Sequence, residues 1–175
     1  LMNLASGKKS TITGGDVDVA SPVFSRDGKV LFFAGSTNSG PIQIGLNMTS
    51  QEHPYRAGLY AAVLAADGES PLLPGSGDEN VDGQDEDKEK HKNGGEKEEE
   101  VPETVVNLDG LADRIVGLPV AKKNYRRLAA ALDGNLYFLD AVQPGASVQP
   151  PGGDESAENE LARYNFEEKE VQTVL

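Results

Sequence analysis

Apolar and polar positions alternate with short turns along this chain, and two of the clearest apolar runs flank an Asp-Gly pair. The runs are residues 21–25 and 29–34 around Asp27-Gly28, and residues 125–132 and 135–141 around Asp133-Gly134. Asp-Gly between apolar runs favours a β-hairpin, because a type I′ turn needs positive φ at both central residues and glycine adopts it without steric cost. Two hairpins with type I′ turns are therefore predicted.

Further strands are indicated on both sides of the second hairpin. Residues 58–65, GLYAAVLA, predict a third strand, and residues 103–107 predict a fourth that leads through a turn at 108–110 to residues 113–118. Pro119 fits the end of that run, since proline cannot donate to a strand ladder. Residues 160–166 and 169–175 predict a final strand pair.

Two internal matches define a repeat. Residues 25–34, SRDGKVLFFA, align with residues 131–140, ALDGNLYFLD, at an offset of 106 that places Phe32 over Phe138. The opening MNLASGKKSTIT matches the closing YNFEEKEVQTVL, with Asn3 over Asn165. Self-similarity at this scale is the signature of repeat architectures.

Four antiparallel strands per unit are the architecture of a β-propeller blade. The predicted fold class is all-β, with about two four-stranded blades plus the outer strands of a third. We expect residues 16–119 to form one blade with insertions, residues 122–175 to form the next, and residues 1–13 to supply the outer strands of a preceding blade. A ring needs roughly 4–8 blades, so residues 1–175 are expected to be a partial propeller.

The insertions differ in composition. Residues 35–57 contain Ile42, Ile44 and Leu46 and are expected to be ordered. Residues 75–100 carry almost nothing apolar and cannot bury enough surface to offset their ordering entropy, so a disordered acidic loop is predicted. Residues 143–158, rich in proline and small residues, are predicted to be a shorter loop of the same kind.

Charge and composition exclude several classes of function. The formal net charge is −13, and residues 78–103 hold 12 acidic residues against 4 lysines. Nucleic-acid binding is not expected, because it requires clustered Lys and Arg. The chain has no cysteine, which excludes disulfides and thiolate metal sites. No apolar run reaches the ~18–20 residues of a membrane span, and the start at Leu1 suggests a piece of a longer protein.

One passage resembles a known family. Residues 105–140 contain Asp109-Gly110, then Arg114-Ile115-Val116, Leu118-Pro119-Val120 and Asn124-Tyr125. This order is similar to that in the propeller region of tricorn-type serine peptidases, and residues 21–36, SPVFSRDGKVLFFAGS, resemble the family's Ser-Pro-Asp-Gly strand pair, with Arg26 in place of proline. The Asp-Gly strand pair also occurs in TolB-like propellers.

The resemblance implies a propeller segment without the PDZ-like and catalytic modules that follow in such peptidases. Its partners would be the remaining blades, the catalytic module and peptides, in a cytoplasmic and oligomeric parent protein. No cofactor, metal, nucleic-acid or membrane partner is expected.

Few residues could carry chemistry. Serine catalysis needs a nucleophile, a base and an orienting group, and neither His53 in a loop nor His91 in the acidic tract has a rigid frame, so no catalytic residue is assigned. Asp78, Asp82 and Asp85 lack the spacing of an EF-hand loop. The basic cluster consists of Lys122, Lys123, Arg126 and Arg127 around Tyr125. It could attract an acidic peptide terminus, or be a solvated inter-blade loop with Tyr125 packed between blades.

Three hypotheses follow. In the first, the chain is a non-catalytic segment of a tricorn-like serine peptidase that scaffolds and guides peptides toward a distant active site in proteolysis. In the second, it is a TolB-like propeller that binds protein partners with no hydrolase attached. In the third, it is a truncated product without activity.

Overall fold

The computed structural model describes residues 1–37, 56–73, 104–141 and 159–175. Several predictions fall on the remaining residues: the acidic loop at 75–100, the loop at 143–158, and most of the excursion at 35–57. They lie outside the described residues and stay predictions.

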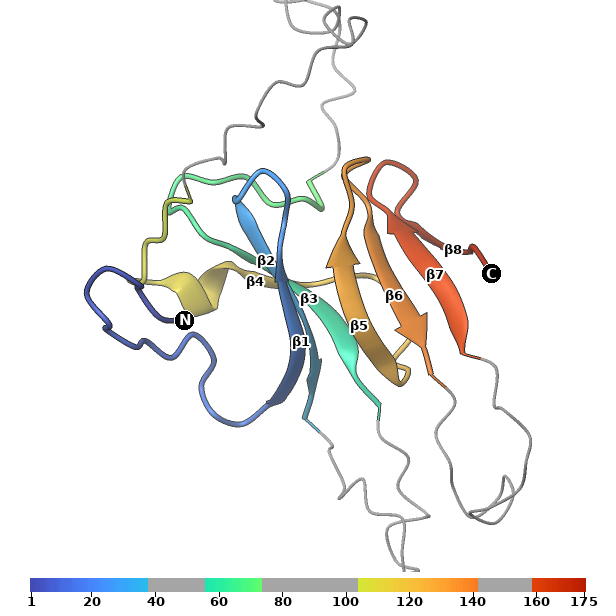
Figure 1. The fold of residues 1–175 in the computed structure, drawn as a ribbon, viewed down its shortest axis with the longest axis horizontal. Helices are drawn as coiled ribbons and strands as arrows, with labels where there is room; N and C mark the ends of the chain where they lie inside the picture. Colours follow the sequence, from blue (N-terminus) through green and yellow to red (C-terminus); the bar gives the residue numbers. More distant parts are fainter. Residues whose placement is uncertain (38–55, 74–103, 142–158) are drawn as a thin grey trace, which may run out of the picture.

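Two four-stranded antiparallel sheets make up the described part of the chain, and in each sheet consecutive strands are neighbours (Figure 1). The first sheet consists of β1 (Asp18–Phe24), β2 (Val30–Ser36), β3 (Gly58–Val63) and β4 (Ile115–Gly117). The second consists of β5 (Tyr125–Ala130), β6 (Leu136–Asp140), β7 (Glu160–Asn165) and β8 (Glu170–Thr173). The predicted all-β class with two four-stranded blades is confirmed.

The two Asp-Gly hairpins form, but their turns are not of type I′. Gly28 and Gly134 have φ of 69° and 78°, whereas neither aspartate has positive φ. The N–H of Gly28 donates to the Ser25 carbonyl at 3.0 Å, so a β-turn comes first and the glycine follows it in the left-handed region. Each aspartate stays in the turn because its Oδ1 accepts the N–H two residues further on, at 3.1 Å in the first hairpin and 3.0 Å in the second.

The predicted strand at 103–107 is wrong for the residues that are described. Residues 104–107 adopt no regular secondary structure, and the short η2 helix (Leu111–Arg114) precedes β4. Polar side chains hold this segment in its irregular path: the Asn107 Oδ1 accepts the Ala66 N–H at 2.9 Å, and the Arg114 guanidinium donates to the carbonyls of Asn107 and Val63. These contacts replace the ladder that a strand would have made.

The two hairpins differ by one residue, which shifts the repeat. Val23 pairs with Phe32 where Ala129 pairs with Tyr137, so the offset is 106 residues between β1 and β5 but 105 between β2 and β6. The cause is the turn, because Ser25 closes the first loop on Val30 whereas Ala131 closes the second on Asn135. A one-residue shift exchanges the two faces of a strand. The predicted alignment of Phe32 with Phe138 is therefore wrong, and Phe138 corresponds to Phe33.

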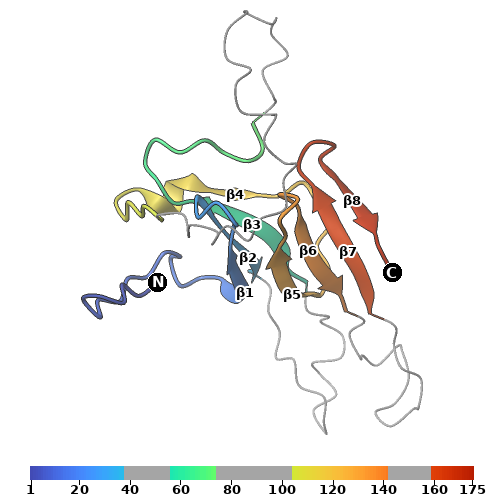
Figure 2. The same cartoon turned by 45° about the horizontal axis from the view of Figure 1, so that its top comes forward.

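The sheets pack against each other through one apolar cluster (Figures 1 and 2). Its buried members from the first sheet and the residues next to its strands are Val30, Phe32, Ala34, Ala57, Leu59, Ala61 and Leu118. Its buried members from the second sheet are Tyr125, Leu136, Phe138, Ala162 and Tyr164. Phe166, in the β7–β8 turn, closes one end of the cluster with its ring 5.5 Å from that of Phe32. A second cluster lies on the other face of the first sheet and includes Leu31, Phe33 and Ala62.

The first strands of the two sheets meet at matching irregularities. The ladder shifts between Ala20 and Val23 in β1 and between Arg126 and Ala129 in β5. Within each shift one residue has positive φ, 53° at Ser21 and 52° at Arg127. The Arg127 N–H donates to the Ser21 Oγ at 3.2 Å, so the two bulges contact each other across the interface between the sheets.

The two turn glycines provide a matched test of this geometry. In a Gly134→Ala variant the free energy of unfolding should fall by about 1 kcal/mol, because alanine is strained in the left-handed region. No atom beyond the two adjacent residues lies within 4 Å of the new Cβ, so strain is the whole effect. Gly28→Ala should lose more, because its Cβ would also collide with the Thr104 side chain. Urea unfolding measures both losses, and adding Thr104→Ala should remove the excess. Equal losses in the two single variants would contradict the turn geometry.

Candidate functional site

The predicted basic residues lie at the entrance to the second sheet. Lys122 and Lys123 precede β5, and Arg126 and Arg127 belong to it; all four are exposed. The Lys123 backbone pairs with that of Ala57, with N–O distances of 2.9 and 3.0 Å. The backbone just before β5 is therefore fixed to the backbone just before β3, and this pairing holds the basic cluster next to the first sheet.

Lys123 has a partner within its own sheet. Its Nζ lies 2.5 Å from the Asp140 Oδ2, and Asp140, at the end of β6, pairs with Tyr125 in the ladder. Half-exposed ion pairs of this kind contribute about 0–1 kcal/mol. The pair neutralises much of the charge that Lys123 would offer a ligand, and the sequence pattern did not point to Asp140.

Tyr125 is the buried anchor of the segment. Its side chain belongs to the cluster between the sheets, as predicted, and its ring lies edge-on at 4.9 Å from that of Phe138. Its hydroxyl donates to the Ala121 carbonyl at 2.5 Å. Burial, and after it the nearby Asp140 carboxylate, raise the pKa of Tyr125 to about 12. The anchor is therefore a neutral donor under ordinary conditions, and it holds the loop that carries Lys122.

The bulge in β5 determines the directions of the Arg126 and Arg127 side chains. A bulge places an extra residue on one strand and redirects its side chains, and here Arg126 and Arg127 are both exposed although they are adjacent. The Arg126 Nε donates to the Asn124 Oδ1 at 3.3 Å. The backbone of Arg127 is held by Ser21 of the neighbouring sheet, which the sequence did not identify as part of the site.

Asn124, like Asp140 and Ser21, is a residue to which the sequence analysis gave no role in the site. It is 3% exposed, and its Nδ2 finds no protein hydrogen-bond partner among the described residues. Its backbone carbonyl accepts the Ala141 N–H at 3.0 Å. It thus joins both ends of the β5–β6 hairpin to the Arg126 side chain and sets where that guanidinium lies.

The arginines have no counterpart in the first sheet. Ala20 pairs with Ala34 where Arg126 pairs with Leu139, so an alanine occupies in β1 the place of Arg126 in β5. Ser21 occupies the place of Arg127. The repeat therefore conserves the bulge while the cations are particular to β5. Exposed guanidinium groups recognise carboxylates, often through paired hydrogen bonds.

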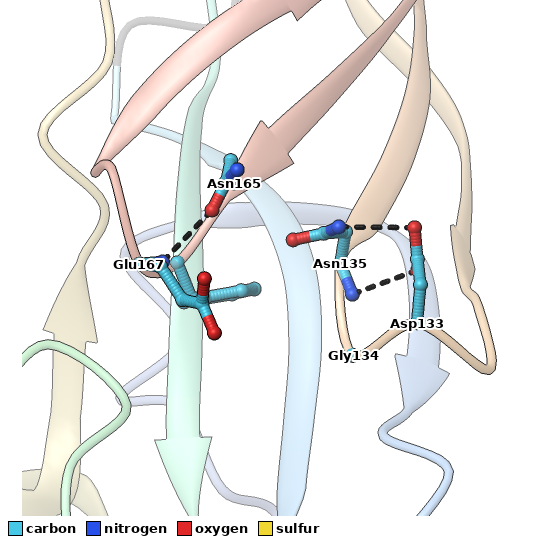
Figure 3. Close-up of a pocket in the computed structure, with 6 residues that line it drawn as sticks. Asp133, Gly134, Asn135, Asn165 and Glu167 are labelled. Atoms are coloured by element: carbon cyan, nitrogen blue, oxygen red, sulfur yellow. Dashed lines mark hydrogen bonds between the residues drawn. The ribbon is translucent and has the colours of Figure 1, made fainter.

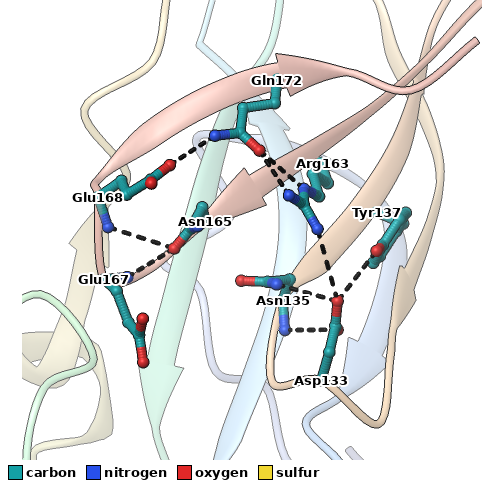
Figure 4. Close-up of polar contacts among 8 residues, drawn as sticks. All are labelled: Asp133, Asn135, Tyr137, Arg163, Asn165, Glu167, Glu168 and Gln172. Atoms are coloured by element: carbon teal, nitrogen blue, oxygen red, sulfur yellow. Dashed lines mark hydrogen bonds and ion pairs between the residues drawn. The ribbon is translucent and has the colours of Figure 1, made fainter.

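A polar hollow of about 250 Å³ lies between the β5–β6 and β7–β8 turns (Figure 3). It is lined by Asp133, Gly134, Asn135, Asn165, Phe166 and Glu167. The Asn135 side chain and N–H, together with the Tyr137 hydroxyl and Arg163, lower the pKa of Asp133. Figure 4 shows that these groups bond to one another, with Asn165 Oδ1 accepting the N–H of Glu167. Their contacts stabilise the turns.

Other chemistry has little support in the described part of the chain. Residues 1–37, 56–73, 104–141 and 159–175 contain no group of three or more His, Cys, Asp and Glu side chains that could hold a metal ion. They contain no helix long and apolar enough to cross a membrane. His53 and His91, and the aspartates Asp78, Asp82 and Asp85, lie outside the described residues.

Comparison with known proteins supports the resemblance seen in the sequence. No family model matches the chain. It is 31% identical over 161 residues to tricorn protease homolog 1 of Streptomyces coelicolor, an alignment that covers 87% of this chain and 14% of that protein. The crystal structure of the tricorn protease matches its fold with a TM-score of 0.62 at 14% identity, over 98% of this chain and 15% of that one.

These similarities confirm the resemblance to tricorn-type peptidases and the propeller fold class. The chain is similar to a segment of a tricorn-type peptidase and spans about one seventh of the length of that curated relative.

The raised pKa of Tyr125 predicts a loss of stability in alkali. Below pH 10 the hydroxyl is protonated in both the folded and the unfolded chain. Between pH 10 and about 12 the unfolded chain releases the proton and the folded chain retains it, so the free energy of unfolding should fall by roughly 2 kcal/mol as pH rises. Unfolding in urea at several pH values measures the slope.

Tyr125→Phe is the matched control. It should reduce the alkaline slope to the part that Tyr164 contributes, because burial also raises the pKa of Tyr164. An unchanged slope in the variant would contradict the assignment to Tyr125.

Proposed function

We propose that this chain is a non-catalytic propeller segment of a tricorn-like serine peptidase, and that it scaffolds and guides peptides toward an active site elsewhere in the parent protein. The observation that carries the proposal is the pair of exposed arginines, Arg126 and Arg127, on the first strand of the second sheet. A peptide offers a carboxylate at its C-terminus, and guanidinium groups bind carboxylates through paired, charge-assisted hydrogen bonds.

The position of the arginines supports a guiding role. They lie where β5 meets β1 of the neighbouring sheet, and the Arg127 N–H donates there to the Ser21 hydroxyl. Lys122 adds a third exposed cation, whereas Lys123 is paired with Asp140. The formal net charge of the whole chain is −13, and this excess of acidic groups would repel a peptide carboxylate from surfaces away from these cations.

The same proposal includes the partners that a segment would need. These are the remaining blades and the catalytic module of the parent protein, with peptides as the transient ligands. We place the parent in the cytoplasm and propose that it is an oligomer. Peptide guidance of this kind would act through steering and weak binding, so its affinity should fall with ionic strength.

Binding of short fluorescent peptides to the 175-residue chain tests the proposal. Fluorescence anisotropy should show tighter binding of a peptide with a free C-terminal carboxylate than of its C-terminally amidated form. The double variant Arg126→Gln, Arg127→Gln should lower the affinity for the free-carboxylate peptide by about tenfold, or about 1.4 kcal/mol of binding free energy. It should also abolish the preference over the amidated peptide.

The matched control removes two charges elsewhere. Lys8→Gln with Lys29→Gln takes away two exposed lysines that lie outside β5 and should leave the preference intact. Equal weakening in both double variants would show attraction by net charge alone. No preference for the carboxylate in the unmodified chain would overturn the guiding role.

A further inference from the structure

The face of the first sheet that points away from the second sheet carries an apolar hollow of about 350 Å³. It is lined by Leu1, Ile12, Val19, Pro22, Phe24, Leu31 and Phe33. Val19 and Phe24, both on β1, remain 43% and 45% exposed. Figures 1 and 2 place the N-terminal segment on this side, opposite the second sheet.

The internal repeat identifies what this face corresponds to. With the corrected register, Leu31 pairs with Ala62, which pairs with Ile115, so the three form one row across the first sheet. Leu136 pairs with Tyr164, which pairs with Val171, and these form the corresponding row of the second sheet. Phe33 pairs with Tyr60 as Phe138 pairs with Ala162. Leu136, Phe138, Ala162 and Tyr164 are the residues through which the second sheet packs on the first. The hollow therefore lies on the face of the first sheet that is equivalent, in the repeat, to the face by which the second sheet packs on the first.

The N-terminal hairpin matches the last two strands of the second sheet, so it corresponds to the outer strands of a sheet that would precede the first one. Met2 pairs with Lys9 as Tyr164 pairs with Val171, both at an offset of 162 residues. At that offset Gly7, with φ of 67°, corresponds to Lys169, with φ of 56°. The Asn3 Oδ1 accepts the Ser6 N–H at 2.8 Å as the Asn165 Oδ1 accepts that of Glu168 at 3.2 Å. Residues 1–10 thus repeat the β7–β8 hairpin.

This hairpin presents an edge to which a strand can be added. Leu1 and Ser10 bond to each other's backbones, and the Asn3 N–H donates to the Lys8 carbonyl, so the Met2–Lys9 pair between them is not hydrogen-bonded. In such a pair the backbone N–H and C=O point outward, here from Met2 toward the edge. In the second sheet the corresponding edge, that of Tyr164, is paired with β6 through Leu136.

We propose that the apolar hollow is a docking site for a two-stranded β-hairpin that pairs with the Met2 edge and completes a blade whose outer strands are residues 1–10. Its strands would take the places that β5 and β6 occupy in the second sheet. Main-chain hydrogen bonds would fix its register, and alternate apolar side chains would fill the space over Val19, Phe24 and Leu31. This inference deepens the scaffolding part of the proposed function and rests on it, but uses none of the cationic residues.

The chemistry of the second sheet disfavours a second copy of this chain as the occupant. A copy docking head to tail would present the other face of its β5–β8 sheet. On that face Tyr137, Arg163 and Gln172 stand where the first sheet has Phe32, Ala61 and Val116. The Arg163 Nε and Nη2 donate to the Gln172 Oε1 at 2.9 and 2.7 Å. Burying this polar row in an apolar hollow is unfavourable, so the occupant is a different hairpin with apolar positions.

Cysteine labelling tests the site, because the chain contains no cysteine of its own. Val19→Cys is compared with Leu132→Cys, whose parent side chain is 74% exposed in the β5–β6 turn. Both are placed in the 175-residue chain and in the longest polypeptide that its gene encodes. In the short chain a maleimide should modify the two at similar rates. In the longer polypeptide Val19→Cys should react roughly 100-fold more slowly, because labelling requires the blade to open.

A photo-cross-linker attached at Val19→Cys identifies the occupant by mass spectrometry, and Phe24→Cys repeats the test at a second lining residue. The expected product joins a segment of alternating apolar residues outside these 175. A cross-link within this chain or to a second copy overturns the proposal, as does equally fast labelling at the two sites in the longer polypeptide. Because the arginines are unchanged, these outcomes are independent of peptide binding.

Discussion

The shared apolar interface between the two sheets is the interaction on which the rest of this structure depends. Each sheet alone has few strands and two faces, and a small sheet is stable only when an apolar face is covered. Phe32, Leu59 and Ala61 from the first sheet meet Leu136, Phe138 and Tyr164 from the second. Burial of each large apolar side chain contributes about 1.5–3 kcal/mol, which greatly exceeds what the exposed ion pairs supply.

That interface also determines where the polar chemistry lies. Packing the sheets brings β1 beside β5, and the Ser21 hydroxyl then holds the bulge that carries Arg127. Tyr125 enters the same core and fixes the loop before β5 through its hydroxyl. The exposed cations are therefore attached next to the packed interface between the sheets. The hollow on the opposite face of the first sheet offers an apolar surface to another hairpin.

Much of the strand content could be predicted from sequence, because apolar runs flanking Asp-Gly specify hairpins locally. The details that failed depend on contacts distant in sequence or on small differences in turn length. A strand is predicted at residues 103–107, but the side chains of Arg114 and Asn107 hold the described residues 104–107 in a loop. One additional residue in the first turn moves Phe33, rather than Phe32, into the place of Phe138.

The basic cluster shows the same limit. Its four cations are visible in the sequence, but the partner of Lys123 is Asp140, and the group that holds Arg127 is Ser21, which lies 106 residues away. Residue spacing could not reveal either contact, because both arise only when the hairpin closes or the sheets pack. The correspondence between residues 1–10 and the β7–β8 hairpin, by contrast, was detectable from Asn3 and Asn165 and is matched in the backbone geometry.

A double-mutant cycle between Phe32 and Phe166 tests the central claim most directly, because their rings lie 5.5 Å apart and belong to different sheets. Phe32→Leu, Phe166→Leu and the double variant are compared by urea unfolding. Packing of the sheets as consecutive blades predicts a coupling energy of about 0.5–1.5 kcal/mol. Strictly additive losses would contradict the shared interface.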